Sequence, residues 1–340
     1  MKRLLFSIIF KQNVKKINKI SRINKKNFVY YCELENNCYA IKIYRNRYNA
    51  VSRYNNELFW LSQFQEKKFF GVPKIYLSRK IIFWNILVID WIDGVSIKQQ
   101  IENNDNLWID SLYNCLSILE KIWDYKVDFD SKVNDSFDYK SGKKIDNIIK
   151  KLKCKKKNLA SYYDDLLHIY KSMQNDVIFN KSLINSDISL HEFLLYKDKM
   201  TLLDYEYFCM GDINNDLAGI FYSASTSLIN NDNEIGLKSL YKIISNNKHF
   251  KLHNFIFFLI QRLVLADYFA GKSIKDFERI RYHRIIIELY FEKHIRWFQI
   301  IYVVSHFWLK INIDLHNNDI SHNLAILNLK DILLNNAVKQ

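Results

Sequence analysis

The first ninety residues contain short apolar runs of the length and composition that β-strands require. These runs are rich in Val, Ile, Tyr, Phe and Trp, and polar turns separate them. They lie at Asn27–Tyr31, Tyr39–Tyr44, Lys74–Leu77 and Ile81–Trp91. Between the second and third runs, Tyr48–Phe64 places its apolar side chains at the spacing of one helix face. The pattern therefore predicts a small sheet accompanied by one helix.

From Asn106 onward the spacing of apolar residues is mainly helical. Helices are predicted at Leu107–Trp123, Lys144–Met173, Lys251–Phe269 and Phe277–Leu309. One exception is Phe193–Asp204, where two apolar runs flank a polar loop of three residues, Lys197–Lys199. Such a pair of runs predicts a β-hairpin. A sheet-rich first part followed by a mostly helical second part indicates an α+β protein.

The two ends of the predicted hairpin carry carboxylates. With a three-residue loop, Glu192 stands opposite Asp204, and opposite residues in such a pair have Cβ atoms about 5 Å apart. Two carboxylates this close repel each other unless a cation lies between them. Oxygen ligands of this kind suit Mg²⁺ that carries a nucleotide phosphate. Asp187 precedes Glu192 in the loop that enters the hairpin, so it could reach the same space.

Composition narrows the possible classes of protein. The 340 residues are 49% apolar with seven glycines and one proline, which excludes a disordered or collagen-like chain. Five scattered cysteines without a Cys-x-x-Cys pair indicate reduced thiols in a cytoplasmic protein. No apolar stretch has the roughly twenty residues of a membrane span. The net charge of +14 fits an anionic partner or a compositional bias spread over the surface.

The residues around the hairpin resemble a known family. The matching residues, in order along the chain, are Asp187, Glu192, Leu-Leu-Asp204-Tyr-Glu-Tyr, Gly211-Asp212 and Asp216-Leu-Ala. This order is similar to that of the aminoglycoside phosphotransferase and choline kinase group, which has a protein-kinase-like fold. The Ser-Asp-x-x-x-His form is especially similar to kinase-like proteins of lipopolysaccharide and surface-polysaccharide gene clusters.

The N-terminal part resembles the same family. The matching segments are Tyr39-Ala-Ile-Lys42-Ile-Tyr, Arg53-Tyr-Asn-Asn-Glu57, Gly71-Val-Pro-Lys-Ile and Leu87-Val-Ile-Asp90-Trp-Ile-Asp-Gly94. Each segment alone is common, but their joint order and spacing are specific. The resemblance implies a bilobal fold with a nucleotide-binding lobe over residues 1–93. A mostly helical lobe over residues 94–340 would carry catalysis and bind the substrate.

The resemblance also implies roles for individual residues of the nucleotide-binding lobe. Lys42 would contact the α and β phosphates of ATP and would be held by an ion pair with Glu57. Backbone groups of Asp90 and Ile92 would hydrogen-bond the edge of adenine. The first lobe would therefore supply the ATP site.

In the second lobe, the resemblance assigns chemistry to four acidic residues. Asp187 would orient the substrate hydroxyl and accept its proton, and Asp216 would brace the catalytic loop from within. Asp204 would bind the Mg²⁺ that bridges the phosphates, and Glu192 would be the second metal ligand. ATP and Mg²⁺ are the cofactors that these roles require.

Three features depart from the family pattern. Glu192 stands where the family has asparagine, which adds a negative charge beside Asp204. The expected phosphate-binding loop, Ser21–Asn27, contains no glycine. Asn185-Ser186 replaces His-Gly, which is a milder change.

The sequence thus predicts an ATP- and Mg²⁺-dependent phosphotransferase that acts on a hydroxyl of a small molecule or sugar. A lipopolysaccharide or surface-glycan sugar is the favoured acceptor. We expect a cytoplasmic protein, and the basic run Lys150–Lys157 suggests peripheral contact with the anionic inner face of a membrane.

Three alternatives stay open. A pseudokinase without turnover would explain Glu192 and the glycine-free loop. A nucleic-acid-binding protein rests on the net charge alone, so we expect no specific nucleic acid partner. A protein kinase is disfavoured because no Ala-Pro-Glu motif follows Asp204.

Overall fold

The computed structural model describes most of the chain before residue 271. The described residues are 14–21, 27–34, 37–45, 48–81, 83–126, 141–155, 181–231 and 233–270, with short stretches between 163 and 177. The chain divides into two compact units. One unit comprises Met1–Ser141 and Ile178–Phe250, and the other comprises Gly142–Val177 and Lys251–Gln340. All of the candidate site residues lie in the first unit. The predicted lobe boundary near residue 93 stays a prediction.

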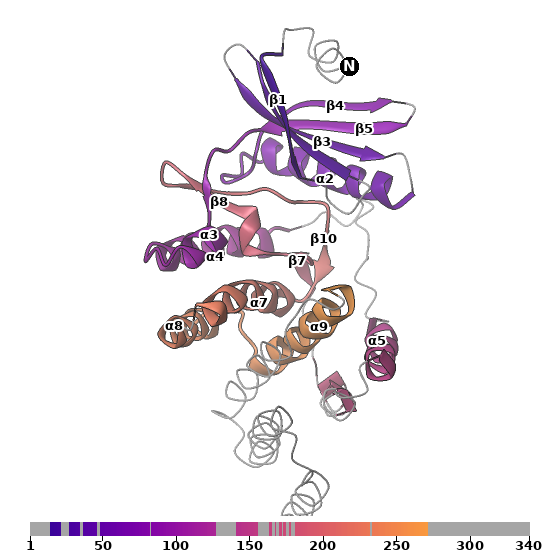
Figure 1. Ribbon diagram of the computed structural model, residues 1–340, viewed down its shortest axis with the longest axis vertical. Helices are drawn as coiled ribbons and strands as arrows, with labels where there is room; N and C mark the ends of the chain where they lie inside the picture. The colour runs from indigo at the N-terminus through magenta and orange to yellow at the C-terminus, as the bar shows by residue number, and fades with distance from the viewer. Residues whose placement is uncertain are drawn as a thin grey trace, which may run out of the picture. The chain divides into compact units, whose positions relative to one another are not determined.

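An antiparallel sheet of five strands forms the N-terminal part of the first unit (Figure 1). Its strands are β1 (Lys16–Ser21), β2 (Asn27–Glu33), β3 (Cys38–Arg45), β4 (Ile75–Ile81) and β5 (Trp84–Asp90). Their spatial order is β1-β2-β3-β5-β4. β5 therefore lies inside the sheet, and its residues 85–89 are all buried. This burial on both faces explains its nearly continuous apolar sequence.

Helix α2 (Tyr48–Glu66) packs against one face of this sheet. Successive side chains of a strand point to opposite faces, so β3 serves two environments. Ile41 belongs to an apolar cluster on the face away from α2. Lys42 and Tyr44 point toward the helix, where both contact Glu57. The alternation of β3 thus places a lysine under α2.

Residues 91–94 link this sheet to the rest of the unit. They lead into β6 (Val95–Ser96), which pairs with β8 (Phe193–Tyr196), and β8 pairs with β9 (Lys199–Leu202). A Cβ atom at Gly94 would lie 2.7 Å from the carbonyl oxygen of Leu195. Glycine is therefore needed at this close approach, which holds the linker against the hairpin.

Helices and a second pair of strands complete the first unit. They are α3 (Ile97–Glu102), α4 (Trp108–Trp123), β7 (Ser182–Asn185), the 3-10 turn η3 (Leu190–Glu192), β10 (Phe208–Gly211), α7 (Ile213–Asn230) and α8 (Glu234–Ser245). β7 pairs with β10, and α7 packs against α3, α8, β7 and η3. The segment that carries Asp187 thus runs from a paired strand to a turn packed on α7.

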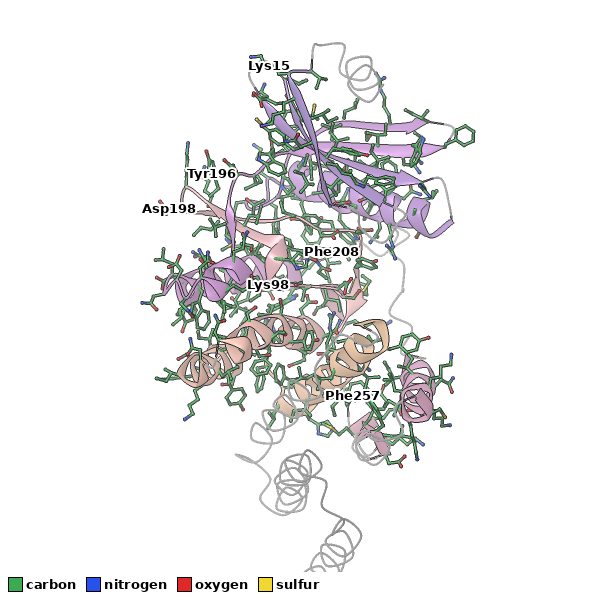
Figure 2. The ribbon with its side chains drawn as sticks, viewed as in Figure 1. Lys15, Lys98, Tyr196, Asp198, Phe208 and Phe257 are labelled. Carbon is green, nitrogen blue, oxygen red and sulfur yellow. The ribbon has the colours of Figure 1, made fainter. Side chains whose placement is uncertain are left out.

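The second unit contains α5 (Ser141–Lys155) and α9 (Leu252–Ala270). The ring of Tyr170 stacks on that of Phe257, labelled in Figure 2, with centroids 4.7 Å apart. The amide of Gln261 donates to the Tyr170 hydroxyl at 3.1 Å. Lys150 and Lys151 are exposed on α5.

The predicted elements agree well with the described ones. All four predicted strands correspond to β2–β5, and the predicted helices at 48–64, 107–123 and 251–269 correspond to α2, α4 and α9. The sequence did not predict β1, β7, β10, α3, α7 or α8, several of which are too short to show a period. The helix predicted at Phe277–Leu309 lies outside the described residues. Among the described helices, none is long and apolar enough to cross a membrane.

Candidate functional site

Lys42 and Glu57 form a buried ion pair. Lys42 Nζ lies 2.5 Å from Glu57 Oε1 and 3.9 Å from Asp204 Oδ1, and it donates to the backbone oxygen of Leu203 at 3.2 Å. The other Glu57 oxygen accepts a hydrogen bond from the Tyr44 hydroxyl. The Glu57 side chain is fully buried, and that of Lys42 is 11% exposed. One lysine therefore joins β3, α2 and the segment that follows β9.

The surroundings of Lys42 keep it charged. Burial by itself would lower the pKa of Lys42, but the carboxylates of Glu57, Asp204 and Glu206 raise it above its ordinary value. A buried cation of this kind is held in one place by its partners. Its ammonium group is thus a fixed point charge beside Asp204.

The hairpin exists, but its predicted register was wrong. Phe193 pairs with Leu202 and Tyr196 with Lys199, so the loop has two residues, Lys197 and Asp198. Both have positive φ, 46° and 61°, as a type I′ turn requires. Aspartate tolerates positive φ better than most residues, but lysine rarely adopts it, so the sequence did not indicate a two-residue turn. Tyr196 and Asp198 mark this tip in Figure 2.

The corrected register changes the partner of Glu192. Its backbone oxygen accepts a hydrogen bond from Leu203 N at 3.0 Å, so Asp204 lies one residue beyond the opposite position. The Glu192 side chain is 12% exposed, and its Oε2 atom is buried with no hydrogen-bond partner. Burial, together with the carboxylates of Asp204 and Asp187, raises the pKa of Glu192 well above its ordinary value. The three acids are thus close enough to repel.

Asn185 organises the residues on either side of this acidic group. Its amide donates to the backbone oxygen of Asp204 at 3.0 Å, and its Oδ1 accepts from the Asp187 backbone N–H at 3.3 Å. Ser186 Oγ donates to the backbone oxygen of Tyr207 at 3.0 Å. The two residues that replace His-Gly therefore tie the Asp187 loop to the Asp204 segment.

Asp216 braces the same loop from the protein interior. Its Oδ2 accepts hydrogen bonds from Trp123 Nε1 and from the Asn185 backbone N–H, both at 3.0 Å. Asp216 is completely buried at the start of α7. This is the bracing contact that the resemblance implied, and Trp123 of α4 is a partner that the sequence did not predict.

The linker residues Asp90 and Ile92 are half-buried. The Asp90 carboxylate accepts from Lys74 N at 2.7 Å and from the Tyr76 hydroxyl at 2.8 Å, while its own N–H donates to Lys74 O. Trp91 N donates to Cys38 O, which fixes the linker to β3. The Asp90 N–H and carboxylate are therefore both used to hold β5 and the chain around Lys74 together.

The acidic group fits a hard divalent cation. Carboxylate oxygens are the ligands that Mg²⁺ prefers, and Mg²⁺ commonly takes one or two of them together with substrate phosphates. The buried Glu192 oxygen without a partner is consistent with such a ligand. Within the described part of the chain, no group of three or more His, Cys, Asp or Glu side chains is placed to hold an ion by itself.

Some contributors to the site had no signal in the sequence. Asn56 of α2 donates its amide to the backbone oxygens of Glu206 and Phe208 at 3.0 and 2.9 Å. Its partners lie about 150 residues away in the chain, so no local pattern marks it. The predicted phosphate-binding loop at Ser21–Asn27 falls largely on residues 22–26, which lie outside the described residues.

Comparison with known proteins identifies the fold. A scan against protein-family models and a search of curated proteins gave no match. Among solved structures, spectinomycin phosphotransferase APH(9)-Ia in complex with ADP and spectinomycin matches with a TM-score of 0.61 at 12% identity. The match covers 84% of this chain and 93% of that one.

Two further structures agree. A thermostable mutant of aminoglycoside phosphotransferase APH(4)-Ia, bound to ADP and hygromycin B, matches with a TM-score of 0.56 at 9% identity, over 84% of this chain and 97% of that one. Choline kinase LicA from Streptococcus pneumoniae matches with a TM-score of 0.53 at 16% identity, over 85% and 98%. At these identities the likeness establishes the fold. The α+β, protein-kinase-like fold predicted from the sequence is confirmed.

Proposed function

We propose that this protein transfers the γ-phosphoryl group of ATP to a hydroxyl group of a small molecule or sugar. The observation that carries the proposal is the convergence at Lys42, whose ammonium lies 2.5 Å from Glu57 and 3.9 Å from Asp204. Desolvation offsets much of the attraction in a buried ion pair, so the pair is weak evidence for a role in stability, whereas buried charges with shifted pKa values gather at functional sites. Three similar folds that were solved with ADP or named as kinases support the same conclusion.

Each residue of the site has a role in this reaction. Lys42 would bind the α and β phosphates, and Glu57 would hold Lys42 in place. Asp204 and Glu192 would bind Mg²⁺, which when present neutralises charge on the phosphates. Asp187 would orient the acceptor hydroxyl and take its proton while the acceptor oxygen bonds to the γ-phosphorus and the bond to ADP breaks. Phosphoryl transfer demands chiefly this positioning and charge neutralisation.

The acceptor is the least constrained part of the proposal. A sugar of lipopolysaccharide or a surface glycan is our first choice, because such acceptors are anionic and this chain carries a net charge of +14. Aminoglycoside-like and choline-like acceptors are the alternatives. A cytoplasmic location with peripheral contact at the inner membrane face belongs to the same proposal, through exposed lysines such as Lys150 and Lys151.

Transfer of radiolabel tests the proposal directly. The purified protein is incubated with [γ-³²P]ATP, Mg²⁺ or Mn²⁺, and candidate acceptors that include surface-glycan extracts. We expect transfer by the wild type and by Asp110→Ala, an exposed acid in the first turn of α4, and none by Asp187→Ala. Absence of both transfer and metal-dependent ATP binding in the wild type would sink the proposal.

A nucleotide-binding protein without turnover is the second candidate, and Glu192 favours it. An additional carboxylate beside Asp204 repels the triphosphate and can hold a metal in an unproductive position. In that case the wild type would bind ATP and Mn²⁺ without transfer, and Glu192→Asn would gain transfer. If instead the wild type transfers the phosphoryl group and Glu192→Asn loses this transfer, Glu192 is a functional metal ligand.

A further inference from the structure

One stripe of helix α2 faces the segment that follows Asp204. The stripe consists of Arg53, Asn56, Glu57, Trp60 and Phe64, which recur at helical spacing. Glu57 holds Lys42, as described above. The other members contact residues 205–208, so a single helix face serves both the lysine and the segment that carries Asp204.

Aromatic contacts pack residues 205–208 against α2. The ring of Phe208 lies 6.2 Å from that of Trp60 and 5.9 Å from that of Phe64, measured between centroids. Tyr205 stacks on Phe208 at 4.9 Å and is completely buried. Figure 2 labels Phe208 at this place beneath α2. These contacts hold the side chains of the segment but leave its backbone carbonyls to other partners.

Asn56 binds those carbonyls. Its Nδ2 atom lies 3.0 Å from Glu206 O, 2.9 Å from Phe208 O and 3.5 Å from Tyr205 O. An asparagine amide has two N–H donors, which are enough for the two short contacts. Glu206 and Phe208 are buried, so their carbonyls would find no water if the amide were removed.

We propose that Asn56 is a positioning residue that fixes the Asp204 carboxylate for metal binding. This inference rests on the proposed function, since it concerns the same site. Its amide immobilises the backbone of residues 206–208, and Glu206 N in turn donates to Asp204 Oδ1 at 3.2 Å. The Asp204 side chain is thereby held through its own chain neighbour.

The other side of Asp204 is anchored independently. Lys42 donates to Leu203 O at 3.2 Å, and Asn185 donates to Asp204 O at 3.0 Å. Asp204 therefore lies between two anchored points, one before it and one after it. Removal of Asn56 weakens only the second, which the Ser186–Tyr207 bond and the aromatic contacts still hold in part. The expected defect is thus a misplaced carboxylate, while the Lys42–Glu57 pair is retained.

Arg53 reinforces the same arrangement. Its guanidinium lies 4.8 Å from the centre of the Tyr207 ring, and its Nε is 3.8 Å from Glu206 Oε2. Arg53 and Asn56, one turn apart on α2, thus hold the side chains and the backbone of residues 206–208.

A purely structural role for Asn56 would predict lower thermal stability with unchanged metal binding.

The test compares Asn56→Leu and Asn56→Asp, which keep the shape but remove the donors, with Asn55→Leu at an exposed neighbouring position. Binding of ADP is measured by calorimetry with Mn²⁺ and again in EDTA. We expect both Asn56 variants to weaken Mn²⁺-dependent ADP binding at least about tenfold, while metal-free binding stays within about twofold. Asn55→Leu should match the wild type in both, and Asn56→Gln, with donors on a longer arm, should fall between.

Hydrogen exchange supplies a readout that needs no nucleotide. The Glu206 amide, bonded to Asp204, should exchange at least about tenfold faster in Asn56→Leu than in the wild type. If the wild type binds no ADP, the proposed function fails, but this exchange measurement still decides the role of Asn56. Unchanged exchange in Asn56→Leu, or equal loss of metal-free and Mn²⁺-dependent binding, would overturn the inference.

Discussion

The candidate site has a lysine side, around Lys42 and Glu57, and an acidic side, around Glu192 and Asp204. The two sides balance their charges differently. On the lysine side, Glu57 is fully buried and each of its oxygens has a partner, Lys42 or Tyr44. On the other side, Glu192 is nearly as buried, but its Oε2 has no hydrogen-bond partner. Burial raises the pKa of both carboxyls, and with Asp204 and Asp187 nearby that of Glu192 lies well above its ordinary value. The first side is balanced by the protein's own groups, whereas the second concentrates negative charge that a cation would neutralise.

This difference assigns separate consequences to the two sides. Groups that are mutually satisfied stabilise the fold, so their loss should appear in the free energy of unfolding. Groups that repel reduce stability, so their removal should raise it, in a manner that depends on pH. The following predictions test this division, beginning with the largest effect.

Lys42→Met should be the most damaging change. It leaves the Glu57 carboxylate buried without its cation, and the loss of one partner of a buried pair commonly costs about 3–5 kcal/mol. The measurement is the free energy of unfolding in urea. The double variant Lys42→Met/Glu57→Gln removes both charges and should recover most of that stability. A loss below about 1 kcal/mol in the single variant would show that the pair behaves like a surface ion pair.

Asp216→Ala should destabilise the protein by about 2–4 kcal/mol, because two buried donors lose their shared acceptor. Urea unfolding measures the change. Trp123→Phe removes one of these donors and keeps the other bond, so it should cost roughly half as much. Equal losses in the two variants would mean that the Asn185 bond contributes nothing.

Gly94→Ala should destabilise by about 1–3 kcal/mol, because its Cβ would lie 2.7 Å from the Leu195 carbonyl oxygen and would push the linker off the hairpin. Thermal unfolding measures this shift. Asp93→Ala in the same linker is exposed and should change stability by less than about 0.5 kcal/mol. Similar melting temperatures for both variants would contradict the close approach.

Glu192→Gln should stabilise the metal-free protein slightly above neutral pH. The folded protein holds the Glu192 proton more tightly than the unfolded chain does. Stability of the wild type therefore falls as pH rises from the ordinary glutamate pKa toward the raised one, and the variant should fall less.

The free energy of unfolding in guanidinium, measured at pH 5 and pH 8, gives the slope of stability against pH. Burial, with Asp204 and Glu57, raises the pKa of Glu206 to about 8, so a smaller fall should persist in Glu192→Gln. Glu33→Gln, at the end of β2, serves as the matched control. If the slope of Glu192→Gln is as steep as that of the wild type, Glu192 is not repelled by the neighbouring carboxylates.

The lysine side was predictable because it is built from local periodicity. The alternation of β3 and the helical spacing of α2 are both visible in the chain, while the pairing of Lys42 with Glu57 was implied by the family resemblance. The hairpin was also visible, but its register was not. That register depends on positive φ at Lys197 and Asp198, and at Lys197 the surrounding pairing imposes this conformation against the intrinsic preference of lysine.

The remaining contributors act across long separations. Trp123 reaches Asp216 over 93 positions, and Asn56 reaches Glu206 over 150. Trp123 belongs to no motif, and Asn56 lies within the matched segment Arg53–Glu57 without a role of its own, so each is an ordinary member of its helix until the chain folds. Asn185 was identified only as a departure from the family pattern, although it bonds both Asp204 and Asp187.

The sequence by itself therefore determined the α+β class, the strands of the N-terminal sheet and the set of acidic and basic residues from which the site is made. These depend on periodicity, side-chain chemistry and spacing, which are properties of short segments. Only the tertiary structure decided which carboxylates are balanced, which repel, and which amides hold them in place. Those outcomes depend on burial and on contacts between distant segments, because an interaction between two charges is set by their separation and their exposure to water.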